Sequence, residues 1–568
     1  MSRMRLVLLA AAVLVVTLAA SPVGAVTLHV PGDFDFISDA IAAAGHSDTV
    51  IVHPGIYTGA ANRDLDFGGK NLTLIAPGGP EVTIIDCELL GRGFDFHSGE
   101  GTAAIVHGFT IRNGSALRGG GIYCQMSSPT ISGCVFELNT ATEAGAGLYC
   151  FKADPVITAC SFVGNAVLTS GYGHGGGGIQ CNASSPVISE CEFAENSASS
   201  GGGLYCVFGA SPTVEDCDFK ENDAYAYHGG GLFCFDNSTP TISECRFIIN
   251  TAARNGGGVF CWNSSALFVS CDFLANEAFG GIYGFGGGGM GLLGSAPMLI
   301  DCDFVGNHAP RGGGINCRGG STPSIQGGVF RENTATDGGG VYCREASAPN
   351  LRGVLLEWGS ATSGGGLYAE EAYPEMTDCI FAWNVATGAD YYDGGGAVHL
   401  HLSDAIVDSC AFIENSGVLG GAFHVRDCMS TSLSATTLAG NTADQGSAIY
   451  CRESSASAEN CIVAFGVGEA VTCVSAFVEF TCSDVFGNSG GDWVGCIASQ
   501  LGYAGNICAD PLFCGGGVGD IAEDYMIQDG SPCAAANSPC GAMGRWGVGC
   551  ASTIVESRSW GGIKAMYR

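Results

Sequence analysis

The sequence predicts an all-β protein, a right-handed parallel β-helix solenoid with a short N-terminal helical cap and a Cys-rich C-terminal cap. A glycine-rich string recurs along the chain, as in GGGIYC at 119–124 and GGGVYC at 338–343. A second string, Cys-x-Phe-x-x-Asn, follows it, and its asparagines recur every 26 residues, as at Asn139 and Asn165. Strand-forming runs of only a few residues, separated by Gly, Ser, Asn and Pro, fit three short strands in each of about sixteen coils.

Composition narrows the class of partner. The chain contains 91 glycines, and only 14% of its residues are charged. Its formal net charge is -33 and its pI is about 4.4. Such a surface repels nucleic-acid phosphates, so we expect cations or neutral glycans as partners and no nucleic acid.

Residues 1–25 read as a signal peptide. Arg3 and Arg5 precede an apolar run, and Val23-Gly24-Ala25 offers small residues for cleavage. The apolar run is shorter than a membrane span requires, and no later segment looks transmembrane. We therefore expect a secreted or bacterial cell-surface protein, whose 29 cysteines lie where disulfides persist.

Residues 26–104 are predicted to form the N-terminal cap and the first coils. Positions 36–44 read as a short amphipathic helix, and a strand is expected at 49–52. The helix would cover the open end of the solenoid, which otherwise exposes apolar side chains and unpaired backbone groups.

Residues 105–465 are predicted to form β-helix repeats of about 26 residues. Strand alternation places Ile122 and Cys124 inside and Tyr123 outside, and likewise Cys134 and Phe136 inside. The repeated asparagines should form an amide ladder along the axis. They are Asn139, Asn165, Asn196, Asn222, Asn250, Asn276, Asn307, Asn333, Asn384, Asn415 and Asn441.

Residues 466–550 are predicted to form Cys-rich final coils and the C-terminal cap. The strict period is lost there, while eight cysteines appear from Cys473 to Cys550. Stacked cysteines in the repeats would be too distant and too parallel for unstrained bridges, so we expect buried free thiols there and disulfides after Cys473. Residues 551–568 form a basic tail, which is either a sorting or attachment signal or a surface-docked end.

The paired motifs Gly-Gly-[Gly/Ala]-[Ile/Leu/Val] and Phe-x-x-Asn, over roughly residues 105–465, resemble those of chlamydial polymorphic outer membrane proteins. The wider fold resembles pectin-lyase-like right-handed β-helices. The first resemblance implies adhesion. The chain departs from that family at its end, where it has neither the length nor the alternating segments of an autotransporter barrel.

Three inserts break the period at one corner, at 166–173, 277–286 and 385–393. They project from the rod and bring aromatic residues, including Phe279 and Phe285, to one edge. Aromatic faces beside acids suit sugar stacking, although such side chains can also simply pack over the next coil. The predicted ligand-binding residues are Tyr172, Tyr225, Tyr227, Tyr283, Tyr391 and Tyr392.

Acidic residues flank the inward cysteines of the central coils and should form two outward carboxylate ladders. Hard oxygen ligands at this density suit Ca²⁺, and Arg246 interrupts one ladder. The alternative is a solvated acidic face that keeps the rod soluble. The predicted metal-binding residues are Glu190, Glu192, Asp216, Asp218, Asp301 and Asp303.

A zinc site is a further hypothesis. By alignment of the coils, His399, His424 and Cys451 occupy the first cysteine column in three consecutive coils, with Ala369 leaving space above. Imidazole and thiolate at that spacing could hold Zn²⁺. The alternative is that the histidines fill volume and bond to backbone groups.

These features favour a secreted or cell-surface structural and binding protein that presents a rigid face to glycans or other surface molecules. The alternative is a polysaccharide lyase or glycoside hydrolase. Gly173-His174-Gly175 matches a tripeptide of polygalacturonases, but their Asn-Thr-Asp and Arg-Ile-Lys strings do not occur. We interpret His174 as a turn residue, and no catalytic residue is assigned.

Overall fold

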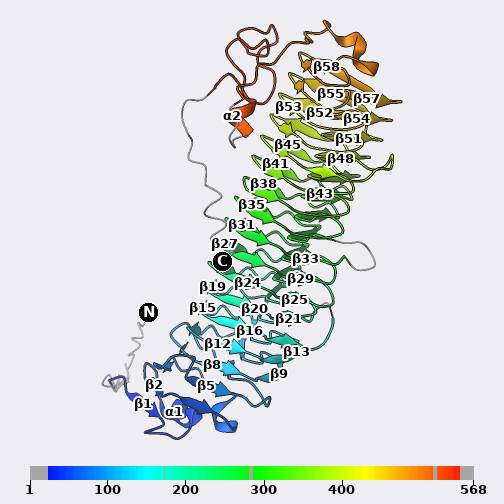
Figure 1. Cartoon of the computed structure of the whole chain (residues 1–568). Helices are drawn as coiled ribbons and strands as arrows, with labels where there is room; N and C mark the ends of the chain where they lie inside the picture. Colours follow the sequence, from blue (N-terminus) through cyan, green and yellow to red (C-terminus); the bar gives the residue numbers. More distant parts are fainter. Residues whose placement is uncertain (1–23, 172, 281–285, 516–520, 551–568) are drawn as a thin grey trace, which may run out of the picture.

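The predicted parallel β-helix is confirmed. A computed structural model describes residues 24–171, 173–280, 286–515 and 521–550, in which the chain winds as a rod of stacked coils (Figure 1). Both the signal peptide up to residue 23 and the basic tail at 551–568 lie outside the described residues. Among those described, no helix is long and apolar enough to cross a membrane.

Three long parallel sheets form the walls of the rod. Sheet A contains 18 strands and sheet C contains 15, and in both each strand pairs with its equivalent in the next coil. Sheet A runs from β1 (Thr27–Val30) to β58 (Phe477–Thr481), sheet B from β3 (Gly55–Tyr57) to β59 (Asp484–Phe486), and sheet C from β6 (Phe94–Phe96) to β57 (Val471–Val474).

One central coil illustrates the path of the chain. It passes through β18 (Ile179–Asn182) in sheet C, β19 (Val187–Ser189) in sheet A, β20 (Glu192–Ala194) in sheet B and the short β21 (Ser197–Ala198). The glycines before sheet C are required because the coils approach closely there. A Cβ on Gly203 would stand 2.6 Å from the Gly231 carbonyl oxygen.

The predicted helical cap is present as α1 (Ile37–Ala43). Its residues Ile37, Ala40 and Ile41 are buried against the first coils. The apolar face of α1 therefore closes the first coil, as expected of a solenoid end.

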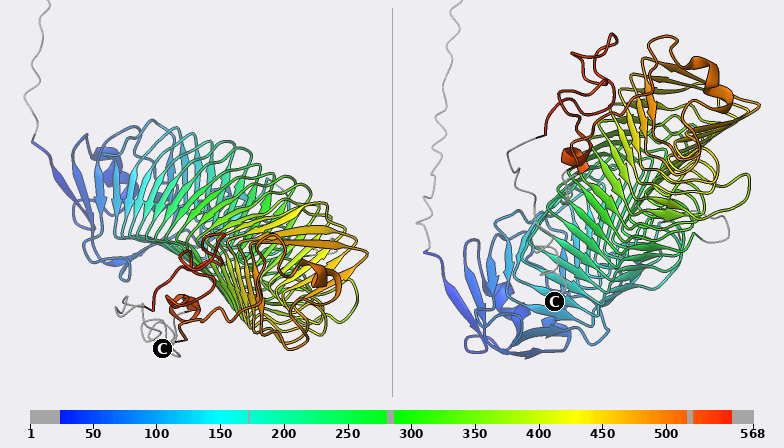
Figure 2. Two further views of the ribbon diagram at one scale, coloured as in Figure 1. Left: turned by 90° about the horizontal axis from the view of Figure 1, so that it is seen from above. Right: turned by 45° about the horizontal axis from the view of Figure 1, so that its top comes forward.

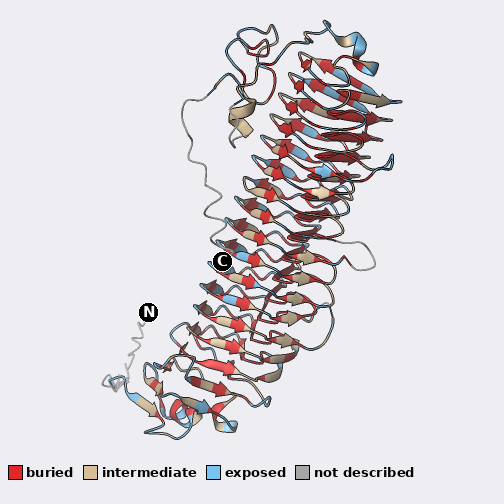
Figure 3. Ribbon diagram, in the orientation of Figure 1, coloured by how far each residue is buried: buried red, intermediate tan, exposed pale blue. Residues whose placement is uncertain are grey.

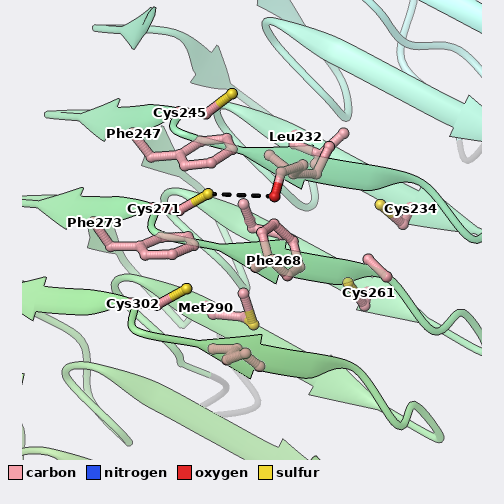
Figure 4. Packing of buried hydrophobic residues seen from close by; sticks show 14 of the residues in the cluster. Leu232, Cys234, Cys245, Phe247, Cys261, Phe268, Cys271, Phe273, Met290 and Cys302 are labelled. Atoms are coloured by element: carbon pink, nitrogen blue, oxygen red, sulfur yellow. Dashed lines mark hydrogen bonds between the residues drawn. The ribbon is translucent and has the colours of Figure 1, made fainter. Parts of the chain in front are cut away.

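The core is built from repeated columns of one residue type, and buried positions alternate along many strands, as in β11 (Thr130–Ser132) and β12 (Val135–Glu137) (Figure 3). Successive phenylalanine rings stack along the axis, with the centroids of Phe247 and Phe273 5.0 Å apart. Beside them stands a column of buried thiols, in which Cys271 Sγ donates to the Ile242 carbonyl at 3.6 Å (Figure 4). The predicted inward positions of these cysteines and phenylalanines are confirmed.

The predicted asparagine ladder is confirmed, in two runs. Asn222 Nδ2 donates to Asn250 Oδ1 at 2.9 Å and to the Phe193 carbonyl at 2.8 Å, and the side chain is fully buried. The first run extends from Asn139 to Asn333 and the second from Asn384 to Asn441. Gly359 separates the two runs. Its backbone N–H donates to Asn384 Oδ1, but it has no side-chain amide to continue the ladder toward Asn333.

The C-terminal part contains all three disulfides, which confirms their predicted location. They are Cys473–Cys496, Cys482–Cys540 and Cys514–Cys550, whereas the other 23 cysteines are free thiols. The 3-10 helix η3 (Gly495–Gln500) lies against the last strands of sheets A and C, and its Ile497 is buried there.

Beyond η3 the chain does not cover the open end but folds back along the side of the rod (Figure 2). The Arg545 guanidinium donates to the carbonyls of Cys379 and Ser409, and Gly544 donates to the Asn460 carbonyl. Ile521 and Tyr525 of helix α2 (Ile521–Tyr525) pack against a cluster of buried residues on the outside of sheet B, which includes the small residue Ala411. The expectation of a simple cap was therefore incomplete.

Candidate functional site

The outer face of sheet C is the candidate site. In each of its strands the first and third residues belong to the core, and the second and fourth point outward. We call the second positions the tyrosine column and the fourth positions the outer column. The strands that carry them are β10 (Ile122–Gln125), β14 (Leu148–Phe151), β18, β22 (Leu204–Val207), β26 (Leu232–Phe235), β30 (Val259–Trp262), β34 (Met290–Leu293), β37 (Ile315–Arg318), β40 (Val341–Arg344), β44 (Leu367–Glu370), β48 (Val398–His401), β51 (Phe423–Arg426) and β54 (Ile449–Arg452).

The N-terminal half of this face is aromatic and apolar. Tyr205 and Phe233 stack at 5.0 Å between ring centroids, and both are buried. Phe235 and Trp262 in the outer column approach to 5.1 Å and pack against this cluster. The glycine turns at the edge of the sheet pack closely against these outward rings, since a Cβ on Gly175 would stand 2.3 Å from Tyr205 Cδ1.

The C-terminal half of the face is charged, and sequence reasoning missed it. Four arginines occupy the outer column at Arg318, Arg344, Arg426 and Arg452. Acids partner them, so the face is an ion-pair network without a large net charge. The pairs are Arg318–Glu345, Arg344–Glu370, Arg426–Asp427 and Arg452–Glu453. Three of these arginines directly follow the cysteine of the repeated string, which is a signal readable from sequence.

The predicted tyrosines lie beside this face where the structure describes them. Arg426 lies over the Tyr392 ring at 4.5 Å, and Arg452 over the Tyr391 ring at 4.9 Å, while about half of each tyrosine is exposed. Tyr227 stacks with Arg254 at 4.6 Å. Tyr225 is partly exposed and donates to the Val167 carbonyl. Tyr172, Tyr283 and Phe285 lie outside the described residues.

The zinc hypothesis placed the histidines in the wrong column. His399 and His424 pair with each other and continue to Tyr450, whereas Cys451 pairs with Val425. The histidines therefore stand in the tyrosine column on the outer face, and Cys451 points into the core. A shift of one residue reverses the face on which a strand side chain lies, so the three groups cannot share one ion.

The two imidazoles are in contact at a tilt of 59° between their planes, neutral and held in one tautomer. Their centroids lie 4.5 Å apart, and burial lowers the pKa of His424 to about 3 and that of His399 well below its usual value. His424 Nδ1 donates to the Asp393 carbonyl at 2.9 Å, and His399 Nδ1 donates to the Gly394 carbonyl at 3.3 Å. Both Nε2 atoms are buried lone-pair acceptors with no hydrogen-bond partner among the described residues.

A cavity of about 140 Å³ interrupts the same face between its two halves. It lies at Gly291, which pairs with Phe260 on one side and Asn316 on the other. The cavity could not be predicted from the sequence of a single repeat, because it depends on the residues that flank Gly291 in the two neighbouring coils. Its lining consists of His228, Arg254, Asn255, Phe260, Trp262, Gly291, Leu292, Leu293, Asn316 and Arg318.

The acidic residues proposed for calcium lie elsewhere, on the outside of sheet B and its preceding bend. Glu192 pairs with Asp218, which in turn pairs with Arg246, and Arg246 forms an ion pair with Asp218. The column continues through Asp272 to Asp303; burial and the Asp303 charge raise the pKa of Asp272.

The second predicted ladder, which contains Glu190, Asp216 and Asp301, does not lie within the strands of sheet B. Its residues lie in the left-handed bend that precedes each strand. Glu190, Asp216 and Asp301 have φ values of 54°, 50° and 50°. Within the described residues, no three His, Cys, Asp or Glu side chains converge as a metal site. Calcium binding there stays a prediction.

His174 directly follows the first insert and the turn at Gly173. Its Nδ1 is hydrogen-bonded to Thr169 Oγ1 at 2.6 Å, and its carbonyl accepts from Ser199 Oγ. The first contact is local, and the second joins His174 to the next coil, 25 residues away.

Comparisons with known proteins identify the fold class. The family model for the right-handed β-helix region matches residues 169–290 and, in a second overlapping match, 257–418. This confirms the predicted handedness, while the resemblance to chlamydial polymorphic outer membrane proteins stays a prediction. No curated protein sequence matches the chain.

Several solved structures are similar to the chain at low identity. Tailspike protein 3 of bacteriophage CBA120 shares 10% identity with a TM-score of 0.29, over 78% of this chain and 56% of the tailspike, so the chain spans about half of that protein. A pectate lyase shares 14% identity with a TM-score of 0.23, over 65% and 82% of the two chains. A PL6 family alginate lyase shares 8% identity with a TM-score of 0.26, over 81% and 92%.

Proposed function

We propose that this right-handed β-helix is a secreted or cell-surface protein that binds glycans along the outer face of sheet C. One observation carries the proposal. Four buried acceptor atoms on this face have no hydrogen-bond partner among the described residues, namely Gln180 Oε1, Asn316 Oδ1, His399 Nε2 and His424 Nε2. Buried polar groups of folded proteins are normally satisfied, so these four acceptors call for donors from water or a ligand.

A glycan supplies such donors at repeated positions. Its hydroxyl groups would donate to the acceptors spaced along the rod, and its apolar ring faces would stack on Tyr391 and Tyr392, which are half-exposed and lie against Arg452 and Arg426. Because acids already pair with the arginines of the outer column, a neutral glycan fits the face better than a polyanion does.

A glycan array with the full chain tests this proposal. We expect binding to neutral oligosaccharides, and we expect a Tyr391→Ala, Tyr392→Ala double variant to lose at least about tenfold in affinity, because stacking contributes a kilocalorie or more at each ring. Tyr503→Ala is the matched control, since Tyr503 is 72% exposed but lies in the C-terminal segment. Equal loss in the control, or no binding to any glycan, would contradict the proposal.

The alternative is a polysaccharide lyase or glycoside hydrolase. The neutral histidines favour it, because His399 and His424 each carry an Nε2 lone pair without a partner among the described residues, and such a lone pair can accept a proton. Release of reducing ends or unsaturated sugars from a polysaccharide panel, with and without calcium, separates the two functions. Turnover lost in a His399→Gln, His424→Gln variant would establish the enzyme.

A further inference from the structure

The cavity at Gly291 lies where a bulky column lacks one side chain. Among the described strands of sheet C, Gly291 is the only glycine in the tyrosine column, where the neighbouring coils carry Phe260 and Asn316. The space left is about 140 Å³, close to the size of cavity that accepts one small ring or a comparably sized group.

Most of the cavity wall is apolar and uncharged. Phe260, Trp262, Leu292 and Leu293 contribute apolar side chains to the lining. His228 stacks on Phe260 with centroids 4.4 Å apart, and burial lowers its pKa to about 3, so this imidazole is a neutral part of the wall. A ligand without an apolar group would leave this wall unfilled.

The cavity also contains one acceptor that needs a donor. Asn316 is 2% exposed, and its Nδ2 donates to the Arg311 carbonyl at 3.4 Å, which fixes the orientation of the amide. Its Oδ1 is buried without a partner among the described residues. Asn255, by contrast, is satisfied, because its Oδ1 accepts from the Gly286 N–H at 3.0 Å and its Nδ2 is bonded to His228.

The two arginines of the lining do not turn this into an anion site. Arg318 is paired with Glu345, and the guanidinium of Arg254 lies over the Tyr227 ring at 4.6 Å. A carboxylate or sulfate entering the cavity would have to displace these contacts, whereas a neutral group leaves them intact.

We propose that this cavity binds the acetamido group of a 2-acetamido sugar residue in a neutral glycan, an inference that rests on the proposed function. The amide N–H would donate to Asn316 Oδ1, and the methyl group would pack against Phe260, Trp262 and Leu293. A plain hydroxyl could satisfy Asn316 but would leave the apolar wall empty. The acetamido group meets both requirements of the cavity at once.

The test uses the full chain and six methyl glycosides. These are the gluco, galacto and manno 2-acetamido sugars and the three parent sugars with a hydroxyl in place of the acetamido group. We expect at least one acetamido sugar to bind about tenfold or more tightly than its parent, a difference typical of one small apolar group. Its acetyl methyl protons should receive the strongest saturation transfer from the protein.

Two variants locate the site. Asn316→Leu should abolish the preference for the acetamido sugar, whereas Gln180→Leu should not. Gln180 is the matched control because it stands in the same column, is equally buried and carries an unpartnered Oε1, but lies outside the cavity. Should Asn316→Leu fail to fold, Gly291→Ala narrows the cavity instead, since its Cβ would stand 2.8 Å from Phe260 Cδ2.

The outcomes separate the two proposals. Binding of neutral glycans with no preference for acetamido sugars, or a preference unchanged in both cavity variants, would overturn the cavity assignment and leave the glycan-binding face standing. Failure of every glycan to bind the chain would overturn the proposed function and the cavity assignment together.

Discussion

The coils at 105–465 contain no disulfide in their described part, whereas the segment at 466–550 contains three. The coils are held by ladders that run along the axis, such as the fully buried asparagines and the stacked phenylalanines. Each asparagine side chain hydrogen-bonds to the asparagine of the neighbouring coil, and the phenylalanine rings stack on one another, so successive coils are held together without a covalent link.

The final segment lacks that regularity. Sheet B ends at β59; beyond η3 the chain then returns along the rod through turns and the short helix α2. Few repeated partners are available to it, and Cys482–Cys540 attaches it to the last coils. The comparison indicates that disulfides replace ladders where the axial repeat ends, and five predictions test this interpretation.

Thiol reactivity should show the largest difference. Of the 23 free cysteines, only Cys508 is exposed. We expect one thiol to react rapidly in the native protein and the others to react at least about a thousandfold more slowly, because they require unfolding of the coils. An aromatic disulfide reagent under non-reducing conditions should then titrate about 23 thiols after denaturation. A total below about six would show that the coils are cross-linked.

Loss of the Cys482–Cys540 bridge should release the final segment. A Cys482→Ser, Cys540→Ser variant opens a link across 58 residues, which is worth about 4 kcal/mol of local stability. We expect proteolysis within 509–550 while the coils stay protected. Cys508→Ser is the control, because Cys508 is exposed and unpaired. Uniform protection in both variants would mean that packing alone holds the segment.

Asn222→Ala should lower the stability of the coils by about as much as loss of the Cys482–Cys540 disulfide lowers that of the final segment. It removes the partners of the Phe193 carbonyl and the Asn196 amide, and two buried unsatisfied groups cost together about 4 kcal/mol. Asn333→Ala, at the end of the first run, removes the corresponding partners of the Phe304 carbonyl and the Asn307 amide, but it breaks no hydrogen bond to a following Asn Oδ1 and should cost less. Urea unfolding followed by circular dichroism measures both. Equal losses of unfolding free energy in the two variants would show that the contribution of an asparagine does not depend on its place in the ladder.

Asp484 should make the final segment sensitive to pH. Burial raises its pKa from 3.8 to about 6, so the folded state holds its proton more tightly than the unfolded chain does. Stability is therefore highest below pH 4 and falls by up to about 3 kcal/mol as the pH rises through 6. Asp484→Asn should remove this dependence and stabilise the segment at pH 7.5. An unchanged pH profile in thermal melts would contradict the assignment.

Calcium should have the smallest effect, and it concerns the coils. Millimolar Ca²⁺ at the acidic rows of sheet B should raise the melting temperature by about 2 °C through mass action. Replacing Asp216, Asp218, Asp301 and Asp303 with Asn should abolish the shift. Glu375→Gln with Glu459→Gln, on sheet A, is the control. A melting temperature that changes with neither Ca²⁺ nor EDTA would contradict calcium binding and favour the alternative of a solvated acidic face.

The sequence alone determined the coils, the inward thiols, the asparagine ladder and the place of the disulfides. Each of these depends on a residue type that returns once per coil, as Asn196, Asn222 and Asn250 do. A periodic position has the same surroundings in every coil, so its burial and partners follow from the repeat.

Only the tertiary structure decided the functional face. The columns of His399 and Cys451 differ by one residue, and that offset decides whether a side chain faces the core or the outside. The cavity requires Gly291 between Phe260 and Asn316, which come from three coils. The return of Arg545 to Cys379 spans 166 residues. Such features depend on what neighbouring coils place side by side, and no single repeat contains that information.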